Sequence, residues 1–97
     1  MAKLKLRFTN LADQDLDDLY VEGFTTWGEE RADRYYDGLL SRFERICEHP
    51  LMYPVVHDLP EGYRRSVYEK HSIYFIIDGD TVEIRAVVKY QDISKRA

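Results

Sequence analysis

Six residues in the second half of the chain carry side chains that could bind phosphate or transfer protons. They are four cations, one imidazole and one phenol: Arg64, Arg65, Lys70, His71, Lys89 and Tyr90. Cleavage of RNA by its own 2′-hydroxyl requires such groups, because a base, an acid and cations must meet at one phosphate. An unperturbed imidazole titrates near pH 6.5, so His71 suits either proton-transfer role.

The spacing of these residues argues against one convergent catalytic site. Arg64 and Arg65 are neighbours in a predicted strand and therefore face opposite ways, so that at most one points into any single site. His71 begins a strand, where a local hydrogen bond is the structural alternative. We therefore expect no catalytic residue. The candidates for the cleavage alternative are Arg65, His71, Lys89 and Tyr90.

Charge also disfavours direct binding to nucleic acid. The formal net charge is −4, and residues 1–50 hold seven Lys and Arg against eleven Asp and Glu, whereas residues 51–97 are balanced at seven each. Proteins that grip phosphate backbones usually carry a basic excess, because neutralising phosphates supplies most of their affinity. The sequence therefore predicts protein partners.

Length and composition predict a single domain over residues 1–97, without cofactor or metal. A chain of 97 residues with 44% hydrophobic and 13% aromatic residues fits one compact core. Cys47, the only cysteine, has no disulfide partner and lies on an apolar helix stripe, where we expect it buried. No apolar run approaches the roughly 20 residues of a membrane span, so we expect a cytoplasmic protein.

The first fifty residues predict a strand and two helices. Residues 3–8 alternate Lys or Arg with Leu4, Leu6 and Phe8, which we expect to face inward in an edge strand. A helix follows from Asn10, its expected N-cap, to Gly28, with Trp27 as a plug between helices. Residues 29–48 carry an unbroken apolar stripe at spacings of three and four, so 10–48 should form an antiparallel helical hairpin.

The second half predicts three strands after an irregular connector. Residues 50–63 contain all three prolines, and strands are expected at 64–68, 72–77 and 81–88, the last two joined by a tight turn at Asp78-Gly79. The fold class is therefore α+β: an N-terminal strand, a helical hairpin, and three antiparallel strands in one sheet, with the helices on one face. The other face carries Tyr74 and Ile76 and is apolar, so either the connector or a partner peptide should cover it; we favour the peptide.

Several short motifs, in this order, resemble those of the RelE/ParE superfamily of toxins from type II toxin–antitoxin pairs, and within it the ParE branch. Residues 27–39 fit W-G-x-x-x-A-x-x-Y-x-x-x-L, residues 48–50 fit E-x-P, and residues 62–64 fit G-x-R. Residues 71–73 fit H-x-I, and residues 91–93 fit a closing Q-D-[IV]. One difference is Glu69, which occupies a position where a glycine often precedes the H-x-I segment.

The resemblance implies a toxin that acts by binding. ParE-like toxins inhibit DNA gyrase, whereas the RelE branch cleaves messenger RNA on the ribosome, and the shared fold does not choose between them. The acidic charge and the lack of a convergent acid–base set favour the gyrase inhibitor, with a ribosome-dependent endoribonuclease as the alternative. Family pairing also implies a cognate antitoxin, ParD-like or of another family, in a hetero-oligomer.

These expectations assign two groups of binding residues. The gyrase target should contact cationic residues toward the C-terminus: Arg64, Lys70, His71, Lys89, Lys95 and Arg96. The antitoxin should contact aromatic and apolar residues, for which core packing is the structural alternative: Tyr20, Phe24, Tyr36, Tyr74 and Ile76.

Overall fold

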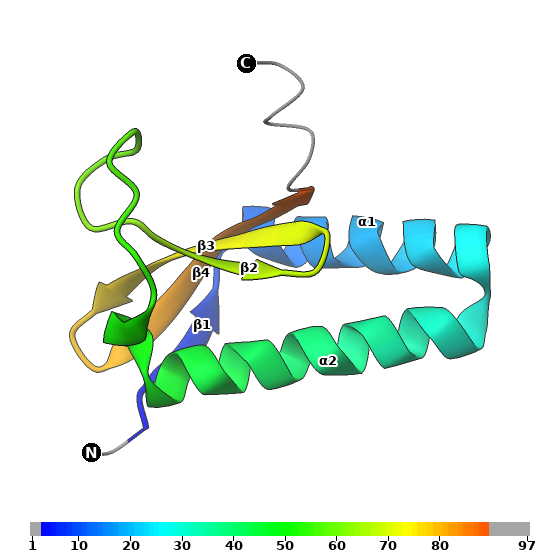
Figure 1. Cartoon of the computed structure of the whole chain (residues 1–97), viewed down its shortest axis with the longest axis horizontal. Coiled ribbons are helices and arrows are strands. Elements are labelled where there is room, and N and C mark those ends of the chain that lie inside the picture. The colour runs from blue at the N-terminus through cyan, green and yellow to red at the C-terminus, as the bar shows by residue number, and fades with distance from the viewer. Residues whose placement is uncertain (1–2, 90–97) are drawn as a thin grey trace.

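The computed structural model describes residues 3–89, which form two helices, one 3-10 turn and a four-stranded sheet (Figure 1). In chain order the elements are β1 (Lys5–Phe8), α1 (Asn10–Trp27), α2 (Glu29–Glu48), η1 (Pro50–Met52), β2 (Arg64–Tyr68), β3 (His71–Asp78) and β4 (Thr81–Lys89). Within this described range no helix has the length and apolarity needed to span a bilayer. The predicted α+β class and element order are confirmed; η1 is an addition to the connector.

The sheet has the strand order β1-β4-β3-β2, so the first strand lies beside the last. β2, β3 and β4 are antiparallel neighbours, as predicted, whereas β1 pairs with β4 in parallel, with Leu6 opposite Val82. The helical hairpin that connects β1 to the rest supplies the crossover that a parallel pair requires. β1 and β2 are therefore the two edge strands.

The hairpin helices begin and end at specific capping residues. Thr9, and not Asn10 as predicted, is the N-cap of α1, because its Oγ1 accepts a hydrogen bond from the Ala12 backbone N at 3.1 Å. The turn between the helices is Gly28, whose φ of +90° is a conformation that favours glycine. A single residue thus reverses the chain and makes the two helices antiparallel.

The core lies between the hairpin and one face of the sheet. Half of its largest fully buried apolar side chains come from α2 and the others from β3 and β4: Leu39, Phe43, Ile46, Cys47, Ile73, Phe75, Val82 and Ile84. Each large aliphatic or aromatic side chain buried here contributes about 1.5–3 kcal/mol. Cys47 is buried as expected, and burial raises the pKa of its thiol.

Trp27 and Leu6, both expected inside, are substantially exposed, as is Phe24, a predicted antitoxin contact. Phe24 is 48% exposed and Trp27 49%, because the tip of the hairpin extends past the end of the sheet (Figure 1). Trp27 is therefore not a plug between the helices. Leu6 of edge strand β1 is 40% exposed, although its neighbours Leu4 and Phe8 pack against the core as predicted.

Two irregularities of β4 shape the surfaces described below. The register with β3 shifts between Tyr74 and Phe75, which leaves Arg85 as an extra, bulged residue. β1 pairs only with Thr81–Ile84, so within the described chain no strand borders the second half of β4 on that side. There the carboxylate of Asp15 accepts a hydrogen bond from the Val87 backbone N at 3.0 Å.

Candidate functional site

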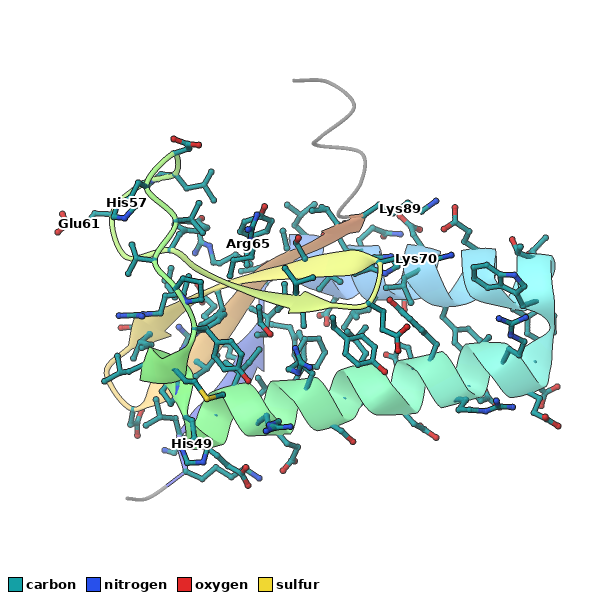
Figure 2. All side chains as sticks on the ribbon, viewed as in Figure 1. His49, His57, Glu61, Arg65, Lys70 and Lys89 are labelled. Carbon is teal, nitrogen blue, oxygen red and sulfur yellow. The ribbon has the colours of Figure 1, made fainter. Side chains whose placement is uncertain are left out.

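A cavity of about 360 Å³ opens where the hairpin tip passes the turn between β2 and β3; we call it the tip cavity. Its apolar lining comes from both helices and includes Leu19, Gly23, Ala32 and the Trp27 ring. The polar residues at its rim are Glu22, Arg31, Glu69, Lys70, His71 and Lys89. Figure 2 shows Lys70 and Lys89 at this same end of the sheet.

His71 is held in the tip cavity by α2. The hydroxyl of Tyr35 lies 2.8 Å from Nδ1 of His71 and donates to the backbone O of Tyr68 at 3.3 Å. Burial raises the pKa of Tyr35 to about 12, so this phenol stays protonated and neutral at physiological pH. The expectation was a local hydrogen bond, whereas the hydrogen bond described here joins His71 to a helix residue 36 positions earlier.

The two lysines of the rim make different contacts. Lys89 Nζ lies 2.8 Å from Oε2 of Glu22, an ion pair that joins the end of β4 to α1. Lys70 Nζ lies 5.4 Å from the centroid of the Trp27 ring, in a cation–π contact. Lys70, His71 and Lys89, all predicted to bind the target, are thus brought together.

A second depression, the sheet groove, measures about 620 Å³ and lies on the sheet face opposite the helices. The connector forms one wall, and two arginines share the groove with two tyrosines: Arg65, Arg85, Tyr63 and Tyr74. Arg85 Nε donates to the Tyr63 hydroxyl at 3.0 Å, and its Nη1 lies 2.7 Å from Oε1 of Glu83. The apolar far face is therefore partly covered by the connector, and a groove remains.

The structure separates the residues of the predicted cleavage set. Arg65 lies in the sheet groove, whereas His71 and Lys89 line the tip cavity on the other side of the sheet. Arg64 faces away from Arg65, as predicted, and its Nη1 donates to the backbone O of Tyr53 at 2.7 Å, at the opposite end of β2 from Lys70. The remaining predicted residues lie outside the described range: Tyr90, Lys95 and Arg96.

The residues predicted to bind an antitoxin fall into two groups. Tyr20 packs against Phe24 and Tyr36 with ring centroids 6.3 and 5.6 Å apart, and its hydroxyl donates to Asp33 at 2.6 Å. These three aromatics form one cluster on a hairpin surface that does not line the tip cavity. Tyr74 and Ile76 lie on the far face of the sheet.

The sequence and the fold together decide the family. The family described as the ParE toxin of the type II toxin–antitoxin system parDE matches residues 6–93, nearly the whole chain. The chain belongs to the ParE toxin family. Toxin ParE1 of Caulobacter vibrioides is 35% identical over 91 residues, which cover 94% of this chain and 93% of that protein.

Solved structures show the same fold as this ParE family member. A chain of the chromosomal ParDE system from P. aeruginosa matches with a TM-score of 0.79 at 20% identity, over 90% of this chain and 96% of that one. A chain of the toxin–antitoxin complex RelBE2 from Mycobacterium tuberculosis matches with a TM-score of 0.71 at 19% identity, over 92% of this chain and all of that one. The RelE/ParE fold predicted from the motifs is thereby confirmed.

Sequence reasoning missed three residues of this ParE toxin that line its two depressions. Arg31 lines the tip cavity and contacts the ring of Trp27, four residues earlier in the chain. Within one helix this spacing would predict a contact, but Gly28 separates the two residues into different helices. Arg85 and Tyr63 join Arg65 in the sheet groove. The bulge at Arg85 leaves no mark in the alternation of β4, so the sequence carries no signal for that convergence.

Proposed function

We propose that this chain inhibits DNA gyrase by binding to it in the cytoplasm and that a cognate antitoxin neutralises it. The observation that carries the proposal is the separation of Arg65 from His71 and Lys89 by the sheet. Acid–base cleavage needs these groups at one phosphate, so their separation favours a toxin that acts through contact surfaces. Lys70, His71 and Lys89 are the proposed contacts to gyrase, with Arg64, Lys95 and Arg96 as further candidates.

The hairpin cluster is the proposed anchor for the antitoxin. The rings of Tyr20, Phe24 and Tyr36 pack together, and the Phe24 side chain is nearly half exposed. Contiguous aromatic surface of this kind suits the core of a protein–protein interface. Tyr74 and Ile76, on the opposite side of the sheet, are proposed to meet an extended segment of the same antitoxin. The ParDE and RelBE2 assemblies named above are toxin–antitoxin systems, which supports such a partner.

Ribosome-dependent cleavage of messenger RNA is the second candidate function, because Arg65 and Arg85 line one groove. Two guanidinium groups beside two phenols are suited to a phosphate and a stacked base. Against it, Glu83 pairs with Arg85 and Arg7, and hydrogen bonds from both arginines lower the pKa of that carboxylate. Part of the positive charge of the groove is therefore already neutralised.

One experiment separates the two functions. The purified toxin is added to gyrase, with supercoiling and trapped DNA cleavage as readouts, and to translating ribosomes, with messenger cleavage as the readout. Loss of supercoiling with intact messenger supports gyrase inhibition. Messenger cleavage with active gyrase selects the second function, and an Arg65→Gln, Arg85→Gln double variant should then lose it.

A further inference from the structure

The tip cavity contains an unusual arrangement of one tryptophan and two cations. Trp27 is half exposed, and both the guanidinium of Arg31 and the ammonium of Lys70 lie 5.4 Å from its ring centroid. Arg31 comes from the start of α2 and Lys70 from the turn between β2 and β3. The indole therefore contacts two positive charges that originate in different parts of the fold.

Neither cation has a carboxylate partner among residues 3–89. Most other lysines and arginines of that range form ion pairs, among them Lys3 with Glu44 and Arg34 with Glu30. An acidic chain with 18 Asp and Glu has ample carboxylates for its own cations. Two unpaired cations at one cavity mouth therefore present charge that an external carboxylate would complement.

The interior of the tip cavity determines the size and polarity of the side chain that it can hold. Its walls are largely apolar, and its volume of about 360 Å³ is near the lower end of ligand pockets, roughly 300–1,000 Å³. Glu22, one of its two acidic residues, is already paired with Lys89, which leaves the charges of Arg31 and Lys70 for an occupant. The cavity thus fits a short peptide segment with one apolar side chain and a neighbouring carboxylate.

We propose that the tip cavity captures such an acidic-apolar segment of the target protein, gyrase, and that Arg31 and Lys70 bind its carboxylate while Trp27 packs against its apolar side chain. This inference rests on the proposed function. The target is the chosen partner because Lys70, His71 and Lys89, its proposed contacts, line this cavity. The aromatic cluster proposed for the antitoxin lies on another surface of the hairpin.

The chemistry of the site can be tested without gyrase. Trp27 is the only tryptophan, so its fluorescence, excited where tyrosine does not absorb, reports on the cavity directly. The probes are an acetylated peptide of alternating Leu and Glu, its Leu and Lys counterpart, and a single-stranded oligonucleotide. We expect the acidic peptide to shift the Trp27 emission and to bind roughly tenfold more tightly than the basic one, the effect of one charge-assisted contact.

Two double variants, one inside the tip cavity and one outside it, make the same change in net charge. Arg31→Glu with Lys70→Glu should abolish the acidic-peptide signal, whereas Arg34→Glu with Arg45→Glu, at exposed positions of α2 outside the cavity, should bind within about twofold of wild type. Thermal unfolding establishes that both variants fold. Equal binding of the acidic and basic peptides, or tighter binding of the oligonucleotide, would overturn the proposal.

The same two variants then test the partner. In the supercoiling assay the cavity variant should need roughly tenfold more protein for half inhibition, and the control variant about the wild-type amount. Normal inhibition by the cavity variant would overturn gyrase as the occupant even if the peptide binds. If wild-type toxin leaves gyrase active, the proposed function fails, and the peptide measurement still decides whether the cavity binds an acidic-apolar segment.

Discussion

The hydroxyl of Tyr35 on α2 lies 2.8 Å from Nδ1 of His71 at the start of β3. The same hydroxyl lies 3.3 Å from the backbone O of Tyr68, so Tyr35 bridges the imidazole and the end of β2. The contact joins the hairpin to the strand end that forms the rim of the tip cavity. The position of His71 therefore depends on a residue 36 positions earlier in the chain.

Tyr35 should make the stability of the toxin sensitive to alkaline pH. Its pKa is raised from an ordinary 10 to about 12, so the folded state holds the phenolic proton more tightly than the unfolded state. This contribution to stability is fully present below pH 10 and is lost as the pH rises to 12. Between these values the melting temperature of wild type should fall more steeply than that of Tyr35→Phe. Parallel curves would contradict the assignment, and Tyr36→Phe serves as the control.

Gly38 should resist replacement by alanine. Alanine normally stabilises a helix by about 1 kcal/mol relative to glycine. A Cβ at Gly38, however, would overlap the hydroxyl of Tyr68, whereas a Cβ at Gly23 would meet nothing closer than 3.6 Å. We expect Gly38→Ala to lower and Gly23→Ala to raise the free energy of unfolding, measured in urea. Tyr68→Leu in the Gly38→Ala background should recover part of the loss; a stabilising Gly38→Ala would disprove the close packing.

Replacing Glu69 by glycine should stabilise the fold. Glu69 has a φ of +53° in the two-residue turn between β2 and β3, and a side chain there costs on the order of 1 kcal/mol. Glu69→Gly should raise the melting temperature, whereas Glu69→Ala keeps the Cβ and should not. Equal effects of both substitutions would mean that charge, and not backbone conformation, is responsible.

Ser72 and Ser66 should respond in opposite ways to replacement by alanine. Both are buried, but Ser66 Oγ accepts a hydrogen bond from Arg42 at 3.0 Å, whereas Ser72 Oγ has no partner among residues 3–89. Ser72→Ala removes an unsatisfied polar group and should be neutral or stabilising, and Ser66→Ala should cost about 1–3 kcal/mol. Denaturant titration measures both, and a costly Ser72→Ala would reveal a partner for its hydroxyl.

Phe24 should contribute to antitoxin binding more than Leu51, an apolar side chain that is more exposed but lies outside the hairpin cluster. Phe24→Ala removes the exposed ring of the hairpin cluster and should weaken a 1:1 complex roughly tenfold, as expected for an interface anchor. Leu51→Ala in η1 removes a side chain that is 67% exposed and should leave the affinity unchanged. Isothermal titration of the antitoxin measures both, and equal affinities would remove Phe24 from the interface.

The fold was largely predictable, because helix and strand periodicities survive in the sequence. The stripe of residues 29–48 became α2 with the same bounds, and Gly28 ended α1 as expected. The exposure of Trp27 was not predictable, since periodicity shows which face a residue shares but not whether the sheet reaches that far. A helix that continues beyond its sheet keeps its apolar pattern while losing its packing partner.

The candidate sites were less predictable, because they depend on contacts between distant elements. The opposite orientation of Arg64 and Arg65 followed from strand geometry and is confirmed. The convergence of Arg31 and Lys70 on Trp27 depends on how far the hairpin tip lies from the turn between β2 and β3, a distance that no local pattern encodes. The bulge that brings Arg85 to Arg65 could likewise not be predicted from the sequence pattern of the strand.

The carboxylate of Asp15 covers a backbone amide in the second half of β4, where no described strand is paired on that side. The second half of β4 would otherwise offer a bare amide to any extended chain, which is how sheets of separate molecules fuse into aggregates. An intruding strand must first displace a charged acceptor that is held in place by a whole helix. Asp15 thus occupies one of the backbone donors through which this sheet edge could pair with another chain.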